Sequence, residues 1–153
     1  MKRIIKEFEK LKDKKVLFFC LGNKLKGDDG VGEYIFERIK ETKNVFKINA
    51  SISPLNYLDK IKKIKPDCTV IIDCVDMNKR PGSITLKNLK DLYSLPIDTH
   101  SNFLKEYIEA VEIETEWYIL GIQPEQINMP FKLSDIVKER AEELLKIINK
   151  IFS

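Results

Sequence analysis

The chain has 153 residues, of which 43% are hydrophobic, and its 27 basic and 24 acidic side chains give a formal net charge of +3. This composition indicates a globular protein rather than a disordered one, and the balanced charge gives no reason to expect a nucleic-acid partner. Every apolar run is shorter than the roughly 18 residues of a membrane span, and the first ten residues lack the apolar core of a signal peptide. We therefore expect one cytoplasmic domain without a membrane partner.

Helices and apolar strands alternate along the first part of the chain. Apolar side chains recur at helical spacing over residues 1–13, and the continuous apolar run 15–21 is typical of a strand buried on both faces. The pattern predicts a helix over 30–43 and a weaker strand over 45–52. Pro54 then suits the first turn of another helix.

The second part of the chain continues this alternation with one exception. A buried strand is expected over 68–75, and a last strand over 116–122. The short alternating run 83–87 fits a hairpin or an edge strand better than a strict βαβ series. A helix is expected over about 101–112, and Ser134 is the predicted cap of a long C-terminal helix.

This order of elements predicts an α/β fold with three layers, α/β/α, around a mostly parallel, twisted sheet of about five strands. Right-handed crossovers place the first and third strands side by side if the strand order begins 2-1-3. Cys20, Cys68 and Cys74 lie in or beside predicted strands and form no C-x-x-C pair. We interpret them as small buried apolar residues rather than redox or metal-binding groups.

The most informative segment is the loop 22–32, Gly-Asn-Lys-Leu-Lys-Gly-Asp-Asp-Gly-Val-Gly, which joins the first strand to a helix. Its Asp29 follows the first strand and Asp73 ends the third, so both carboxylates should reach the carboxyl edge of the sheet at its switch point. The helix dipole would favour the ionised form of Asp29. His100, the single histidine, is expected in a loop before a helix. Two carboxylates and an imidazole suit a borderline divalent metal with open positions for substrate or water.

Plainer roles fit the same residues. Asp28 is equally well explained as a helix N-cap, Asp73 as a cap of the turn after its strand, and a lone histidine is often structural. Other chemistries have less support, because the chain has no Gly-x-Ser-x-Gly elbow and its cysteines are expected inside strands. The glycine loop matches neither the dinucleotide-binding pattern nor the P-loop.

Four separated motifs resemble those of the [NiFe]-hydrogenase maturation endopeptidases, in the right order over about residues 15–150. They are the loop 22–32, the strand end Ile72-Asp73-Cys74-Val75-Asp76 with Pro81-Gly82, the triplet Thr99-His100-Ser101, and Leu120-Gly121-Ile122-Gln123-Pro124.

The resemblance implies a peptidase that removes a C-terminal extension from the precursor of a [NiFe]-hydrogenase large subunit after nickel insertion. It implies that Asp29, Asp73 and His100 are the catalytic residues and the contacts to nickel, which the substrate carries. No permanently bound cofactor is then expected. Gly27, Asp28 and Gly30 would form the loop that meets the substrate, with the glycines giving a bulky metal centre room to approach. Asp28 and Asp76 are candidates for orienting the attacking water, and capping or turn roles explain both residues at least as well.

Two features depart from the family pattern. Asn49-Ala50-Ser51 stands where family members usually have a Gly-Gly pair after the second strand, which affects how closely a substrate approaches that loop. The expected helix over residues 1–13 lies outside the resemblance. We treat residues 1–153 as a single domain of this type, with that helix as an addition.

A phosphoacceptor receiver domain is the alternative, with Asp28 and Asp29 as its acid pair and Asp73 as its phosphorylated residue. Two features oppose it. A glycine-bearing loop separates the first strand from the acids, and the last strand ends Gly121-Ile122-Gln123 without the lysine that a receiver places against the phosphoryl group.

Overall fold

The computed structural model describes residues 1–90 and 112–153. Within them, a five-stranded sheet has the order β2-β1-β3-β5-β4. Its strands are listed here in that order: β2 (Val45–Ser51), β1 (Val16–Leu21), β3 (Cys68–Cys74), β5 (Glu116–Ile122) and β4 (Ile84–Asn88). His100 and almost all of the helix expected over about 101–112 lie outside the described residues.

The strand pairing confirms the predicted topology. β1 pairs in parallel with β2 on one side and with β3 on the other, and β3 pairs in parallel with β5. The short strand β4 pairs antiparallel with β5 at the edge of the sheet, as its alternating sequence predicted. The order therefore begins 2-1-3. Strand β2 is added on one side of β1 and β3 on the other, so the switch point of the sheet lies between β1 and β3.

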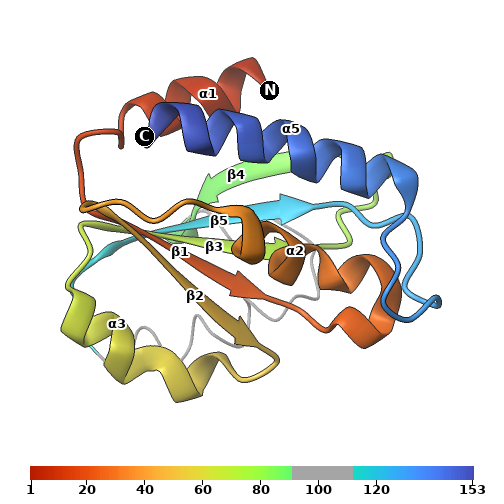
Figure 1. Ribbon diagram of the computed structural model, residues 1–153, viewed down its shortest axis with the longest axis horizontal. Helices are drawn as coiled ribbons and strands as arrows, with labels where there is room; N and C mark the ends of the chain where they lie inside the picture. The colour runs from red at the N-terminus through yellow and green to blue at the C-terminus, as the bar shows by residue number, and fades with distance from the viewer. Residues whose placement is uncertain (91–111) are drawn as a thin grey trace.

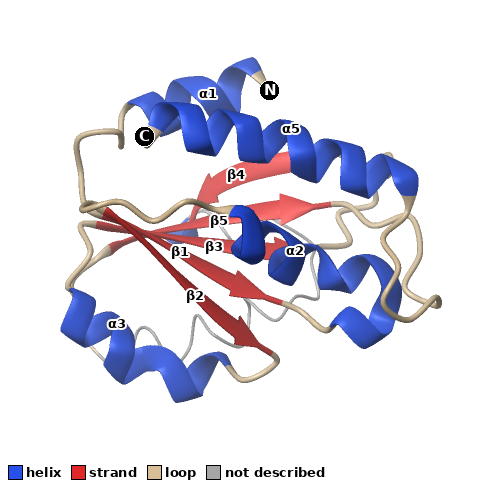
Figure 2. Ribbon diagram, in the orientation of Figure 1, coloured by secondary structure: helices blue, strands red, loops and turns tan. Residues whose placement is uncertain are grey.

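Helices cover both faces of this sheet, which confirms the three-layer α/β/α fold (Figures 1 and 2). One face packs against α1 (Lys2–Glu9), α2 (Val31–Arg38) and α5 (Asp135–Ile151). The other face packs against the 3-10 turn η2 (Pro54–Tyr57) and α3 (Leu58–Ile64). No helix of the described residues is long and apolar enough to cross a lipid bilayer.

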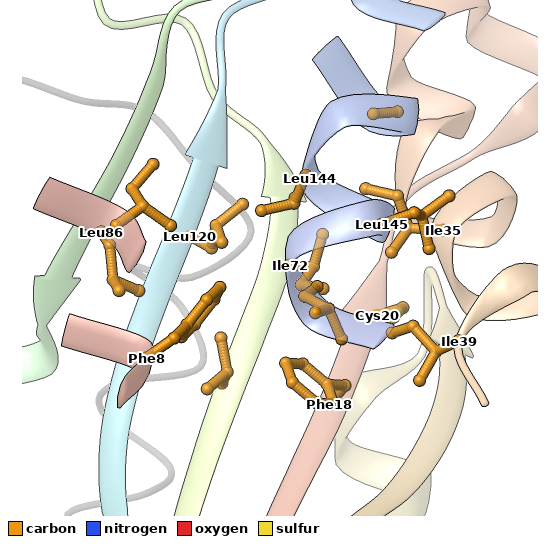
Figure 3. Packing of buried hydrophobic residues seen from close by; sticks show 14 of the residues in the cluster. Phe8, Phe18, Cys20, Ile35, Ile39, Ile72, Leu86, Leu120, Leu144 and Leu145 are labelled. Carbon is orange, nitrogen blue, oxygen red and sulfur yellow. The ribbon is translucent and has the colours of Figure 1, made fainter. Parts of the chain in front are cut away.

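The central strand β1 explains why the sheet needs two helical layers. Its alternate side chains Val16, Phe18 and Cys20 join the core under α1, α2 and α5, while the other three join the core under α3. All six are buried. Burying a large apolar side chain contributes about 1.5–3 kcal/mol, so a strand apolar on both faces is stable only between two layers. Figure 3 shows Phe18 and Cys20 on the same side of the sheet as Ile72 of β3, within the cluster that also contains Leu145 of α5.

Helix α1 belongs to this core, although it is shorter than expected and ends at Glu9. Phe8 of α1 is fully buried and contacts two other aromatic rings edge-on. Its ring centroid lies 6.3 Å from that of Phe18 and 5.6 Å from that of Phe152. Edge-to-face ring pairs of this kind stabilise a core beyond their buried area.

Helix α2 ends at Arg38, five residues before the expected end, for a tertiary reason. Ile39 adopts extended backbone with φ −70° and ψ 132°. The side chain of Asn149 in α5 donates to the Arg38 carbonyl at 3.2 Å and accepts from the backbone N–H of Lys40 at 3.1 Å. Asn149 thus binds the polar groups on both sides of the point where the helix ends.

Trp117 lies near the amino end of β5, in the core layer under α3. Its side chain is 7% exposed. The carboxyl end of β5, where Gln123 follows the strand, lies at the opposite edge of the sheet. That carboxyl edge carries the acidic residues singled out from the sequence.

Candidate active site at the carboxyl edge of the sheet

The loop between β1 and α2 folds back on itself around Asp29. It contains the 3-10 segment η1 (Lys24–Gly30), which the side chain of Asn23 caps by accepting from Leu25 N at 3.0 Å. The backbone N–H of Asn23 donates to the Asp29 carbonyl at 3.1 Å and to Asp29 Oδ2 at 2.9 Å. These bonds close the loop and fix the orientation of the Asp29 carboxylate.

Two glycines make this closure possible through their backbone geometry. Gly22 has φ +131°, and a Cβ at this position would collide with the Asp29 carbonyl. Gly27 has φ +53°, and a Cβ there would collide with the side chain and carbonyl of Gln126. Both values of φ lie in the region that favours glycine. The structure therefore explains these glycines by internal packing, whereas the sequence interpretation attributed the loop's glycines to clearance for an approaching metal centre.

Asp28 is fully buried and turned toward the connection between β5 and α5. Its Oδ2 accepts from the backbone N–H groups of Glu125 at 2.8 Å and Gln126 at 3.0 Å, and from the Ser134 hydroxyl at 2.9 Å. Its Oδ1 accepts from Ser134 N at 2.7 Å. The N-cap of α2 is Gly30, so the helix-capping interpretation of Asp28 was wrong. Ser134 is the N-cap residue of α5 as predicted, but its hydroxyl binds Asp28 and makes no capping bond.

Asp29, the next residue, lies at the wall of a cleft with a volume of about 910 Å³. Its side chain is nearly buried but reaches this open space. Oδ2 is held by Asn23 N, and no other hydrogen bond to the Asp29 carboxylate comes from the described residues. The adjacent acids therefore face different surroundings, and the one that faces the cleft is Asp29.

The cleft is formed by the segments that follow β1, β2, β3 and β5 at their carboxyl ends. Besides Asp29, the described residues that line the cleft are residues 52–56, Cys74, Asp76 and residues 123–127. This position at a sheet edge is the one at which α/β folds bind their ligands. A volume of this size accommodates several residues of an extended peptide.

Asp73 lies near the end of β3, as the sequence predicted, and its side chain is fully buried. The last paired position between β1 and β3 joins Cys20 to Ile72, so Asp73 lies one step further toward the carboxyl edge. Both acids affect the neighbouring thiol of Cys74. Burial raises the pKa of this thiol most, and the negative charges of Asp29 and Asp73 raise it further. The structure thus brings Asp29 and Asp73 to the ends of adjacent strands.

The third residue of the predicted constellation, His100, lies outside the described residues. Among residues 1–90 and 112–153, no three histidine, cysteine, aspartate or glutamate side chains gather closely enough to hold a metal ion. The contribution of His100, and with it a three-residue contact to nickel, therefore stays a prediction.

The cysteines are buried or partly buried free thiols, as predicted. Burial raises the pKa of Cys20 and Cys68, to about 11 for Cys68. Cys74 lines the cleft, but burial and the surrounding aspartates hold its pKa well above the ordinary value. A thiol in this state is protonated at neutral pH and is a poor nucleophile.

Gln123 is a site residue whose role the sequence interpretation missed. It is nearly buried at the end of β5, and its Oε1 accepts from Met77 N at 2.6 Å and Lys79 N at 3.3 Å. These two donors fix the orientation of the amide, so its Nε2 donates to Asp76 Oδ1, at 3.1 Å. The signal in the sequence was a polar residue placed directly after a buried strand.

Asp76 is exposed and lines the cleft on the side of β3. The hydrogen bond from Gln123 lowers its pKa most, and the bond from Asn78 N to the same Oδ1, at 3.1 Å, lowers it further. Its carboxylate is therefore ionised at neutral pH. Of the two acids considered for orienting water, Asp76 faces the cleft, whereas Asp28 is engaged by the loops.

Comparison with known proteins now identifies the fold and the family. The family model described as "Hydrogenase maturation protease" (HycI) matches residues 30–151. A Methanocaldococcus jannaschii protein, provisionally named a hydrogenase maturation protease, is 34% identical over 161 residues, covering 94% of this chain and 92% of that protein. Hydrogenase 3 maturation protease of Escherichia coli K12 is 27% identical over 130 residues, covering 82% and 83%.

A solved structure has the same fold. The [NiFe] hydrogenase maturation protease HycI of Thermococcus kodakarensis matches with a TM-score of 0.83 at 25% identity, covering 96% of this chain and 98% of that one. The endopeptidase HybD of E. coli, at 19% identity and a TM-score of 0.73, covers 86% and 88% and supports the fold.

Proposed function

Because this chain belongs to the hydrogenase maturation protease family, and is therefore a peptidase, we propose that it removes the C-terminal extension from a [NiFe]-hydrogenase large-subunit precursor after nickel insertion. The main support for this proposal is the position of Asp29 at the wall of the cleft. A carboxylate fixed by a single backbone donor lies at the wall of a cavity large enough for an extended peptide, at the sheet edge where the adjacent strands β1 and β3 end.

Nickel enters this proposal as part of the substrate. Carboxylate and imidazole groups are suitable ligands for a borderline divalent ion, so Asp29, Asp73 and His100 would contact the nickel centre and report that it has been inserted. Asp29 keeps its orientation through Asn23 N and retains a carboxylate oxygen for this contact. Asp76, an ionised residue that also lines the cleft, is the group we assign to orient the attacking water.

The receiver domain receives no support from these findings. Its acid pair would need two open carboxylates, but the Asp28 side chain is bound by Glu125, Gln126 and Ser134. At the end of β5, Gln123 organises the loop after β3 instead of offering a cation to a phosphoryl group. We also propose that the protein works in the cytoplasm, without nucleic acid or membrane as partners, in keeping with its near-balanced charge.

The experiment that tests the proposal compares nickel-loaded and nickel-free precursor by mass spectrometry after incubation with the protein. We expect loss of the C-terminal extension in the loaded sample alone. Asp29→Asn, Asp73→Asn and His100→Ala should each suppress this loss while the circular dichroism spectrum stays that of the wild type. Lys60→Glu, on the exposed surface of α3, serves as the control that retains cleavage. An unchanged mass in the loaded sample would refute the proposal.

A further inference from the structure

Exposed apolar side chains concentrate at the edge of the sheet that carries the cleft. Among the described residues, every strongly exposed large hydrophobic side chain except Met1 lies in the loops after β1, β2 and β5. These side chains are Leu25, Ile52, Ile127, Met129 and Phe131. A cluster of this kind at one edge marks an interaction surface rather than random exposure. We call Leu25, Ile127, Met129 and Phe131 the apolar loop face.

The loops that carry the apolar loop face are tied to each other. Phe131 N donates to the Lys24 carbonyl at 2.8 Å, and Asp28 N donates to the Gln126 carbonyl at 2.9 Å. The side-chain oxygen of Gln126 accepts from Met129 N, also at 2.9 Å. The apolar side chains are therefore presented from preorganised backbone, which lowers the entropy lost when a partner binds.

Phe131 has the least structural reason to be apolar. Its side chain is 69% exposed, and its backbone adopts φ +60°. A bulky residue in the left-handed region costs roughly 1–2 kcal/mol relative to one that favours this conformation. Burial does not offset that cost here, since the ring contributes little to the core. An aromatic side chain held outward on a fixed loop is a typical anchor of a protein interface.

The loops that carry the apolar loop face hold three exposed lysines and one exposed carboxylate, that of Glu125, so basic side chains predominate there. Lys24, Lys26 and Lys132 are exposed and belong to the same two loops. Lys24 lies 3.8 Å from Glu33, and neither Lys26 nor Lys132 forms an ion pair with another described residue. Two copies of this chain meeting through the same surface would bring these lysines together, and like charges at an interface oppose association. A partner with an acidic rim is complementary.

We propose that the apolar loop face docks the folded body of the large-subunit precursor, through an apolar patch on the precursor flanked by carboxylates. This inference rests on the proposed function. Its second support is continuity with the cleft: Ile127 belongs to the apolar loop face and also lines the cleft. A precursor held there would deliver its C-terminal segment to Asp29.

The test measures binding and cleavage separately. Biolayer interferometry with immobilised, full-length, nickel-loaded precursor gives Kd, and mass spectrometry gives kcat and KM. Phe131→Asn places at this position a residue that tolerates left-handed backbone, so the fold should be kept. The double variant Lys26→Glu/Lys132→Glu tests the charge. Lys60→Glu changes charge on the exposed surface of α3 and is the control.

We expect Phe131→Asn to raise Kd and KM by about tenfold or more with kcat and Tm close to wild type, since loss of an aromatic anchor commonly costs a factor of this size. The double charge variant should do the same and weaken the salt dependence of binding, whereas Lys60→Glu should not. Unchanged Kd in both loop-face variants would refute the docking inference even if the wild type cleaves. Precursor binding that depends on Phe131 without any cleavage would instead refute the proposed function.

Two other occupants would also overturn the inference. A wild-type dimer in analytical ultracentrifugation that Phe131→Asn disperses, with Kd for the precursor unchanged, would assign the surface to a second copy. Binding to vesicles of phosphatidylglycerol and phosphatidylcholine that Phe131→Asn abolishes, again with Kd unchanged, would assign it to a lipid surface.

Discussion

The carboxylate of Asp28 binds both the backbone and the side chain of Ser134, 106 residues further along the chain, with distances of 2.7 Å from Ser134 N and 2.9 Å from Ser134 Oγ. This pair joins the loop after β1 to the start of α5. Asp28 thereby fixes the loop from which its neighbour Asp29 reaches the cleft. Asp28 and Asp29 are therefore adjacent in the sequence but differ in role: Asp28 holds the loop in place, and Asp29 faces the cleft.

The first prediction separates these tasks by mutation. Asp28→Asn should lower the free energy of unfolding by about 3 kcal/mol or more, because buried donors lose a charged acceptor. Asp29→Asn should change it by less than about 1 kcal/mol, since a single bond from Asn23 holds that side chain, yet it should abolish cleavage. Urea unfolding followed by circular dichroism gives both stabilities. Equal destabilisation by the two variants would contradict the assignment of a structural role to Asp28 and a role in cleavage to Asp29.

The second prediction concerns Gln123 and the ionisation of Asp76. Gln123→Glu keeps an oxygen for Met77 N and Lys79 N but replaces the donor to Asp76 with a negative charge. The pKa of Asp76 should rise, because its largest stabilising contact becomes a repulsive one. Carbon-13 NMR titration of the Asp76 carboxyl carbon measures this. A matched Glu125→Gln variant, which removes a charge from the same cleft wall, should not raise the pKa of Asp76.

The third prediction tests the closure of the acidic loop. Gly22→Ala should lower the free energy of unfolding by about 2 kcal/mol or more and reduce cleavage, because the added methyl group meets the Asp29 carbonyl at a backbone φ that disfavours alanine.

Gly121→Ala is the matched control for Gly22→Ala. Its Cβ would lie 3.1 Å from Val75 Cγ2 and 3.2 Å from Val75 Cβ, which is a tight contact but not a collision with backbone, so the loss should be smaller. Thermal unfolding compares the two variants, and a Tm loss at Gly121 as large as at Gly22 would contradict the explanation.

The fourth prediction is a loss of stability in alkali. Burial raises the pKa of Cys20 in the folded protein above its ordinary value of 9.0. Below pH 9 the thiol is protonated in both states and contributes no pH dependence. Above pH 9 the unfolded chain releases the proton while the folded chain retains it, so stability should fall by about 1.4 kcal/mol per pH unit for each such thiol.

Cys20→Ala provides the control for this alkaline loss. The variant should show a shallower decline of the free energy of unfolding between pH 9 and 10, measured by urea unfolding at each pH, whatever its stability at pH 7. A decline identical to that of the wild type would show that other groups cause it.

Much of the fold could be predicted from local pattern. Apolar runs such as 15–21 and 68–75 can be buried only between two helical layers, and this requirement led to the three-layer sheet and to the adjacency of β1 and β3. The end of α2 could not be predicted in this way. It depends on Asn149, which lies in another helix and binds the polar groups around Ile39 only after the chain has folded.

The site was predictable where position along a strand sets the direction of a side chain. Asp73 and Asp29 reach the same edge because each follows or ends a parallel strand. The roles of Asp28 and Gln123 were not predictable, because each depends on backbone donors from segments far away in the sequence. Local sequence identifies a carboxylate or an amide but carries no information about which distant N–H groups will face it.

The position of Trp117 has a practical consequence for spectroscopy. The single tryptophan lies near the amino end of β5, six residues before Gln123 at the cleft, which is about 20 Å along the strand at roughly 3.3 Å per residue. Its fluorescence should change when the layer under α3 unfolds and should not change when a peptide occupies the cleft. A reporter of substrate arrival therefore has to be introduced, and Phe131→Trp would supply an indole on the exposed apolar loop face.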